Sequence, residues 1–145
     1  MSSPNVAGSL ILLQEHYINT HNNEAMLAAS LKGLIIHTAR ECGPADGPDY
    51  EFGWGLLSAK DAADLIEEDI TKDSTIAELT LNNGDTLFYT FESDGSQPLR
   101  ATISWTDPAG TSSSALNDPT PRLVNDLDLR IMDSLGSTTY EPYIL

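Results

Sequence analysis

The chain has 145 residues, 40% of them apolar, so it can bury a core and suits one domain or two small ones. Its 7 basic and 22 acidic residues give a formal net charge of -15. Such a surface repels phosphate backbones and anionic lipids, which argues against nucleic acid and membranes as partners, and no apolar run approaches the roughly 20 residues of a membrane span.

The first predicted element is a helix over residues 4–20. Ser3 is a suitable N-cap, and Pro4 fits the first turn, where its missing N–H costs nothing. The apolar residues of this segment follow two neighbouring faces: Val6, Leu10, Leu13 and Tyr17 on one, and Ala7, Ile11 and Ile18 on the other. A helix that is apolar around most of its girth is typical of one buried inside a larger body.

Two further helices are predicted before residue 70. The second runs from Asn23 or Glu24 to about Arg40, and its inner side carries Met26, Leu27, Leu31, Leu34 and Ile35. A loop rich in glycine and proline, "CGPADGPDYEFGWG", follows. The third helix begins after Ser58, where "SAKD" has the spacing of a capping box with Asp61 in place of the usual Glu. Its small-residue face consists of Ala59, Ala62, Ala63 and Ile66, and residues 67–73 are interpreted as a solvated linker.

Beyond residue 70 the apolar period changes from that of a helix to that of a strand. The segments 75–81 and 86–92 flank "NNGD", an Asn-Gly turn signal that predicts a hairpin. Further strands are expected over 99–105, 123–132 and 137–145, with a long loop before the second of these and a turn at "DSLG" after it. About five strands at this spacing favour an antiparallel sandwich or jelly-roll. Since five strands leave an open edge, both ends of the sequence are expected to continue in a longer protein.

Metal ligands are expected at one place only. Asp126 and Asp128 lie two residues apart on a predicted strand and therefore share a face. Two adjacent carboxylates repel unless a cation intervenes, so this pair is either a calcium site or a solvated face with Arg122 or Arg130 nearby. Cys42 is the single cysteine, which excludes an internal disulfide and a cysteine-based zinc site.

Other chemistry-bearing side chains are interpreted as structural. His16, His21 and His37 lie on or just past predicted helices, where a surface histidine is ordinary and a cation near a helix C-terminus is favourable. Trp54 and Trp105 are expected to pack in the core or between domains.

Four segments, in chain order, carry a family resemblance. "MSSPNVAG" resembles the segment after the nucleophile of subtilisin-like serine proteases, the subtilases, whose pattern is Gly-Thr-Ser-Met, two small residues, Pro, any residue and Val-Ala-Gly. "LKGLIIHTA" resembles the next subtilase helix, and "GWGLLSAKDA" resembles the Gly-Trp-Gly stretch and the final helix of the catalytic domain. "ISWTDPAG" followed by "LVNDLDLRI" is similar to the β-barrel domain that follows the catalytic domain in an alkaline, oxidation-tolerant branch.

The resemblance implies an α+β chain of two parts. Residues 1–69 would be the helical C-terminal part of a subtilisin-like α/β catalytic domain. Residues 70–145 would be the N-terminal part of a truncated β-barrel of jelly-roll type. The family also often carries calcium, which would suit Asp126 and Asp128 as a structural site.

The resemblance further implies a secreted serine endopeptidase that hydrolyses proteins and peptides through a Ser-His-Asp triad. The nucleophilic Ser would immediately precede Met1, so no catalytic residue is expected in this chain, and Met1, Ser2, Ser3 and Pro4 would border the active site. A Ser at a helix N-terminus gains free N–H groups and the positive end of the dipole. Such a helix must be held firmly, which would explain small residues at Ala7 and Gly8.

The second hypothesis is a non-catalytic β-domain, stabilised by calcium, that binds a partner. Its weakness is the helix over residues 4–20, which needs burial under a sheet. Marked exposed apolar surface would favour the protease fragment, whereas a well-packed, cooperative monomer would favour the module.

Overall fold

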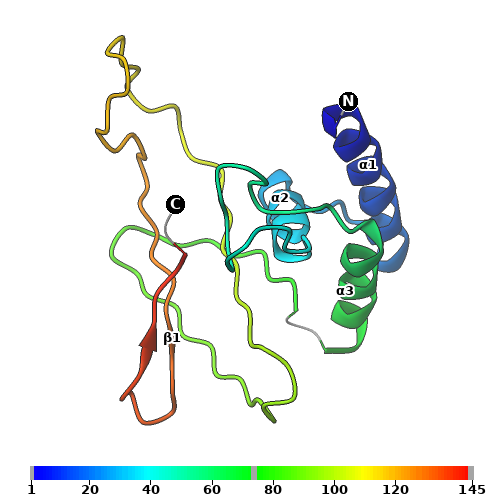
Figure 1. Ribbon diagram of the computed structural model, residues 1–145. Coiled ribbons are helices and arrows are strands. Elements are labelled where there is room, and N and C mark those ends of the chain that lie inside the picture. Colours follow the sequence, from blue (N-terminus) through cyan, green and yellow to red (C-terminus); the bar gives the residue numbers. More distant parts are fainter. Residues whose placement is uncertain (1, 73–74, 144–145) are drawn as a thin grey trace.

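The computed structural model describes residues 2–72 and 75–143. They form a mixed, mostly helical arrangement with one small antiparallel sheet, compatible with an α+β fold. The helices are α1 (Ser2–Thr20), α2 (Ala28–His37) and α3 (Ala59–Lys72), and the strands are β1 (Ile131–Met132) and β2 (Thr139–Tyr140). Figure 1 shows the three helices grouped on one side of the molecule and the extended segments of the second half spread on the other.

The hydrophobic core lies between the three helices. Its buried members come from each helix and from the segment joining α1 to α2, and none is more than 4% exposed: Leu13, Met26, Leu34, Ala62 and Ile66. Tyr17, Leu31 and Ile35 pack against this cluster from outside. The predicted inner faces are therefore confirmed at Leu34 of the second helix, at Ala62 and Ile66 of the third and at Leu13 of the first. The assignment of Leu27 to an inner face is wrong, because this residue precedes α2 and is 58% exposed.

The start of α1 differs from the prediction. Ser3 lies inside the helix, which begins at Ser2, so its assignment as N-cap is wrong. The first N–H groups of any helix have no acceptor in the preceding turn. The missing N–H of Pro4 therefore costs no helical hydrogen bond. The helix can begin before Pro4, at Ser2.

The second helix is shorter at both ends than predicted. Asn22 and Asn23 have positive φ angles of 54° and 62°, which end α1 and turn the chain before an extended segment leads into α2. At the other end, the Arg40 N–H donates to the Leu56 carbonyl at 2.9 Å, and the Leu56 N–H donates to the Arg40 carbonyl at 2.8 Å. This isolated bridge takes the Arg40 backbone out of the helix.

The third helix begins as predicted and ends later. Ser58 Oγ accepts a hydrogen bond from the Asp61 N–H at 3.3 Å, which confirms the cap. The interpretation of residues 67–73 as a solvated linker is wrong over 67–72, which belong to α3. The Asp69 side chain is only 9% exposed and accepts a hydrogen bond from the Ile76 N–H at 2.8 Å. This part of the helix is therefore fixed by packing on one side.

Most of the predicted strands form no ladder among the described residues. The segments 75–81, 86–92 and 99–105 are extended but unpaired, and the Asn-Gly turn explains part of this. A type I′ hairpin turn requires positive φ at both central residues. Here Gly84 has φ 87° while Asn83 is not among the residues with positive φ. Turns with positive φ only at the second position splay the flanking strands apart.

One predicted hairpin is confirmed over a short length. β1 and β2 pair antiparallel, with Ile131 opposite Tyr140 and Met132 opposite Thr139. The predicted turn at 133–136 connects them, and Asp133 organises it by accepting hydrogen bonds from the Ser137 N–H at 2.8 Å and from the Ser137 hydroxyl at 2.5 Å. These bonds hold the pKa of Asp133 at about 2.

Gly8 offers a test of how completely α1 is covered. It lies mid-helix, and a Cβ built on it meets no atom within 4 Å. Because glycine in a helix costs roughly 0.5–1 kcal/mol relative to alanine, Gly8→Ala is expected to raise the free energy of unfolding of this chain by about that amount. Gly33→Ala is the matched control, since a Cβ there lies 3.1 Å from Ser104 Cβ and its gain is offset by crowding. Urea unfolding followed by circular dichroism measures both, and a loss of stability in Gly8→Ala contradicts an uncovered face.

Candidate functional site

The residues expected to border an active site occupy the first turn of α1. Met1 lies outside the described residues, and Ser2, Ser3 and Pro4 are exposed. Over the described ranges, no hydrogen bond joins either serine hydroxyl to a histidine or carboxylate. At 1.5 Å per helical residue, His16 is about 20 Å along α1 from Ser3. This turn therefore presents hydroxyls and free backbone N–H groups without a base.

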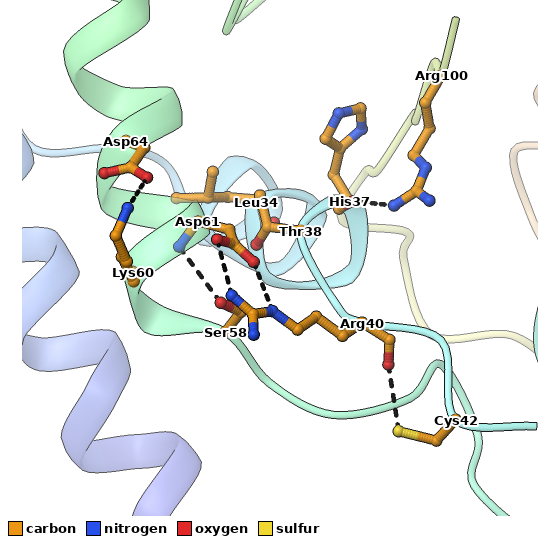
Figure 2. Close-up of polar contacts among 10 residues, drawn as sticks. All are labelled: Leu34, His37, Thr38, Arg40, Cys42, Ser58, Lys60, Asp61, Asp64 and Arg100. Carbon is orange, nitrogen blue, oxygen red and sulfur yellow. Dashed lines mark hydrogen bonds and ion pairs between the residues drawn. The ribbon is translucent and has the colours of Figure 1, made fainter. Parts of the chain in front are cut away.

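A polar cluster ties α3 to the segment after α2 (Figure 2). Arg40 makes two parallel hydrogen bonds to Asp61, from Nε at 2.8 Å and from Nη2 at 3.1 Å. These bonds, followed by the Ser58 hydroxyl, lower the pKa of Asp61 to about 2. The cluster braces the bridge between Arg40 and Leu56, and the single thiol, Cys42 Sγ, donates to the Arg40 carbonyl at 3.3 Å.

His37 joins the helical half to the extended half. Its Nδ1 lies 3.0 Å from Thr102 Oγ1, and Arg100 Nη1 donates to the His37 carbonyl at 2.6 Å. Burial lowers the pKa of His37, and the charge of Arg100 lowers it further. Arg100, Thr102 and Ser104 alternate along the chain and turn their polar side toward α2. The contacts of His37 fit a structural role, but its lowered pKa opposes the cation expected at the helix C-terminus.

A third cluster, which the sequence does not predict, forms where α1 meets α3. The His21 ring stacks on Tyr17 with centroids 3.9 Å apart, and His21 Nε2 lies 3.3 Å from Asp69 Oδ2. A pocket of about 480 Å³ opens here, and Glu24 also lines it. Burial and the nearby carboxylates, Glu78 first, raise the pKa of Tyr17. Thr20 Oγ1 donates to the His16 carbonyl at 2.9 Å, so it is held as part of the helix end and not as a free nucleophile.

The predicted calcium ligands lie just before β1, in a described segment that belongs to no strand. Asp126 and Asp128 are exposed, whereas Leu127 and Leu129 between and after them are half-buried. Arg130 pairs with Glu141 at 3.2 Å. Within residues 2–72 and 75–143, no group of three or more histidine, cysteine or acidic side chains lies close enough to hold a metal ion. Calcium at this pair stays a prediction.

Asp107 joins the two segments that carry the family resemblance in the second half. Its carboxylate accepts hydrogen bonds from the Val124 N–H at 2.7 Å and from the Asn125 N–H and Nδ2 at 2.9 and 2.8 Å. Gly110 is needed beside it, because a Cβ there would lie 2.2 Å from the Arg122 carbonyl oxygen. "WTDPAG" and "RLVND" therefore meet through one carboxylate and one close backbone approach.

The hydrogen bonds from Val124 and Asn125 to the Asp107 carboxylate are expected to persist at acidic pH. The Val124 N–H, followed by the Asn125 groups, lowers the pKa of Asp107 below its ordinary 3.8. A lowered folded-state pKa stabilises the contact above 3.8 and loses that stabilisation as the pH falls through the folded value. In a pH titration by ¹⁵N NMR, the Val124 and Asn125 amides are expected to shift together with a midpoint below 3.8. In Asp107→Asn that shared shift is expected to vanish, and separate midpoints in the unaltered chain would contradict the contact.

The two tryptophans that were predicted to pack differ in their burial. Trp105 is half-buried, with its indole Nε1 enclosed, whereas Trp54 keeps about half its surface exposed among the glycines of the loop. Trp54 therefore does not pack in the helical core, and its packing between domains stays a prediction. Its neighbours Gly53 and Gly55 have positive φ, and they direct the chain out into an open loop.

An apolar groove lies between α1 and α2. It encloses about 560 Å³ and is lined mainly by apolar side chains of both helices and of the segment that joins them: Leu10, Ile11, Gln14, Glu15, Ile18, Met26, Ala28 and Leu31. Ile11 and Leu12 remain 69% and 67% exposed. Gln14 Nε2 donates to the Met26 carbonyl at 3.0 Å, while its Oε1 is enclosed with no partner among the described residues. This surface has the composition of a helix-packing face.

Comparisons with family models, with curated proteins and with solved structures gave no match. Among the described helices, none has the length and apolar character needed to cross a membrane.

Proposed function

We propose that this chain is the C-terminal part of a secreted subtilisin-like serine endopeptidase. In this proposal the enzyme cleaves peptide bonds through an acyl-enzyme, and its Ser, His and Asp lie outside the present sequence. Residues 1–69 complete the catalytic domain, and residues 70–145 begin a β-barrel domain. The chain by itself carries none of the triad and has no proteolytic activity.

The observation that carries this proposal is the uncovered apolar face of α1. Ile11 and Leu12 are largely exposed, and the groove beside them is apolar. Exposing two such side chains in place of burying them forgoes roughly 1.5–3 kcal/mol each. A soluble chain with a face of this kind favours packing against another body, as a helix in the middle of a catalytic domain requires.

The composition of the first turns of α1 supports the same proposal. Ala7 and Gly8 are exposed, and the missing side chain at Gly8 contacts nothing. Glycine weakens a helix, so its presence is explained most simply by a surface that approaches α1 closely in the whole enzyme. The N-terminal N–H groups of α1 would then face the reacting carbonyl and stabilise its developing negative charge.

The second half supports the proposal through Asp107. The two segments that resemble the β-barrel domain are 18 residues apart at Asp107 and Asn125, and the structure brings them into direct contact. If the two motifs belong to one domain, they are expected to contact each other, as they do here.

The test identifies the protein in its natural setting. An antiserum against recombinant residues 1–145, a chain of 15.7 kDa, is applied to cell extracts and culture medium of the source organism. We expect a larger band in the medium that a fluorescent phosphonate labels covalently and that a serine protease inhibitor protects. The recombinant chain is the control and is expected to stay unlabelled. A band of 15.7 kDa alone, unlabelled, overturns the proposal, as does inhibitor-sensitive hydrolysis by the recombinant chain.

The second candidate function is a calcium-stabilised β-domain that binds a partner. It is favoured by the exposure of Asp126 and Asp128, which lie two residues apart in the sequence. Calorimetric titration of the chain with calcium tests it, with the Asp126→Asn, Asp128→Asn double variant expected to lose the binding heat. Asp46→Asn, in an exposed loop, is the matched control and is expected to retain it. Absence of binding heat in the unaltered chain removes this candidate.

A further inference from the structure

The turn at residues 82–85 combines an exposed asparagine with an unhindered glycine. Asn83 and Gly84 are its two central residues, and both are exposed. The turn is closed by the Asp85 N–H, which donates to the Asn82 carbonyl at 3.0 Å. Gly84 has φ 87°, and a Cβ built on it meets no atom within 4 Å. Solvent and the neighbouring side chain therefore reach the Gly84 backbone nitrogen freely.

The two asparagines of this turn differ in their side-chain hydrogen bonds. Asn82 Nδ2 donates to Asp85 Oδ2 at 3.0 Å, and the Asn82 N–H donates to the same oxygen at 3.1 Å. Among the described residues, no hydrogen bond engages the Asn83 side chain or the Gly84 N–H. Asn83 is also the one asparagine in this sequence that a glycine follows.

We propose that Asn83 and Gly84 form a self-modification site, at which the chain converts Asn83 into aspartate and isoaspartate without an enzyme. Hydroxide removes the Gly84 amide proton, and the Gly84 nitrogen attacks Asn83 Cγ. The new N–Cγ bond forms a five-membered succinimide, the Cγ–Nδ2 bond breaks, and Nδ2 leaves as ammonia. Water then opens the ring at the new bond, giving aspartate, or at the original peptide bond, giving isoaspartate. The net reaction consumes one water and releases one ammonia, with no oxidant or reductant.

The glycine makes this reaction accessible for two reasons. It lacks the Cβ that would crowd the approach of its nitrogen to Cγ, and its backbone adopts the conformations that ring closure requires. Asn82 has neither advantage, because Asn83 follows it and its side-chain amide is held by Asp85. One turn therefore contains both the reactive asparagine and its internal control.

The modification changes both the charge and the geometry of the turn. It adds a carboxylate near Asp85, and Asp85 Oδ2 already accepts a hydrogen bond from Asn82 Nδ2. Isoaspartate also lengthens the main chain by one carbon between the segments 75–81 and 86–92. The inference is independent of the proposed protease function.

Mass spectrometry of the folded chain tests the site. The chain is aged at mildly alkaline pH in ordinary water and then digested with trypsin in water enriched in heavy oxygen, so that conversion during digestion is labelled and discounted. The peptide 73–100, released by cleavage after Lys72 and Arg100, contains both asparagines. We expect unlabelled conversion of Asn83 to a mixture of aspartate and isoaspartate, with Asn82 unchanged.

Two comparisons make the result decisive. Gly84→Ala is expected to lose the conversion, and its helical circular dichroism verifies that the core is folded. The chain unfolded in urea is expected to convert Asn83 at a rate similar to that of the folded chain, because the turn leaves this residue open. Retention of Asn83 in the folded chain while the unfolded chain converts would overturn the proposal. So would equal conversion of Asn82, or undiminished conversion in Gly84→Ala.

Discussion

Ile66→Ala is expected to lower the free energy of unfolding by about 2–5 kcal/mol, since the substitution removes three buried carbons and leaves a cavity. Ile66 is fully buried, and among the described residues it is the largest side chain of which this is true. It lies on α3, where Leu13 of α1 and Leu34 of α2 meet it in the core cluster. Small domains are typically stable by only about 5–15 kcal/mol, so a loss of this size removes a large share of the total.

Ile70→Ala is the matched control for this prediction. It removes the same atoms from the same helix one turn later, at a position where the side chain is 53% exposed. Surface substitutions of this kind usually change stability by about 0.5 kcal/mol or less. Urea unfolding monitored by the helical circular dichroism signal measures both variants. Equal losses in the two would show that the core is not centred on Ile66.

Gly55→Ala is expected to break the connection between α2 and α3. Gly55 has φ 97°, a conformation that costs other residues about 1–3 kcal/mol. A Cβ there would also lie 2.2 Å from the Arg40 carbonyl oxygen, so the backbone must move. That oxygen accepts the Leu56 N–H, and its displacement opens the bridge and loosens the Arg40–Asp61 pair beside it.

Gly53→Ala separates backbone strain from the clash. Gly53 has φ 60°, but a Cβ there meets no atom within 4 Å, so only the left-handed conformation is penalised, by about 1–2 kcal/mol. Hydrogen exchange of the Arg40 and Leu56 amides distinguishes the two variants. We expect both amides to lose protection in Gly55→Ala and to keep it in Gly53→Ala, and the opposite pattern would refute the assigned role of the bridge.

The parts of the fold that the sequence predicts are those with local causes. α3 begins where Ser58 caps it, three residues before Asp61, and its buried residues Ala62 and Ile66 follow from the helical period. The turn before β2 forms because Asp133 can bind the amides that follow it. In each case the residues that decide the structure are within four positions of one another.

The parts that could not be predicted depend on neighbours distant in the sequence. The strand period after residue 70 is present, but a strand also needs a partner, and the conformation of Asn83 and Gly84 splays the first pair. The contact of His21 with Asp69 requires α1 to pack on α3 first. Asp107 likewise meets Val124 across a loop whose length and charge do not specify its path.

The loop closed by Arg40 and Leu56 divides the chain into separable parts. Its two ends are held together by a pair of backbone hydrogen bonds, by the ion pair of Arg40 with Asp61 and by the helical core. Tyr50, near its tip, is 91% exposed. A cut between residues 43 and 53 therefore leaves two polypeptides that can associate without a covalent link, and foreign sequence inserted there leaves the helices in place. We expect that the protein can be reconstituted from two fragments that are separated at this loop.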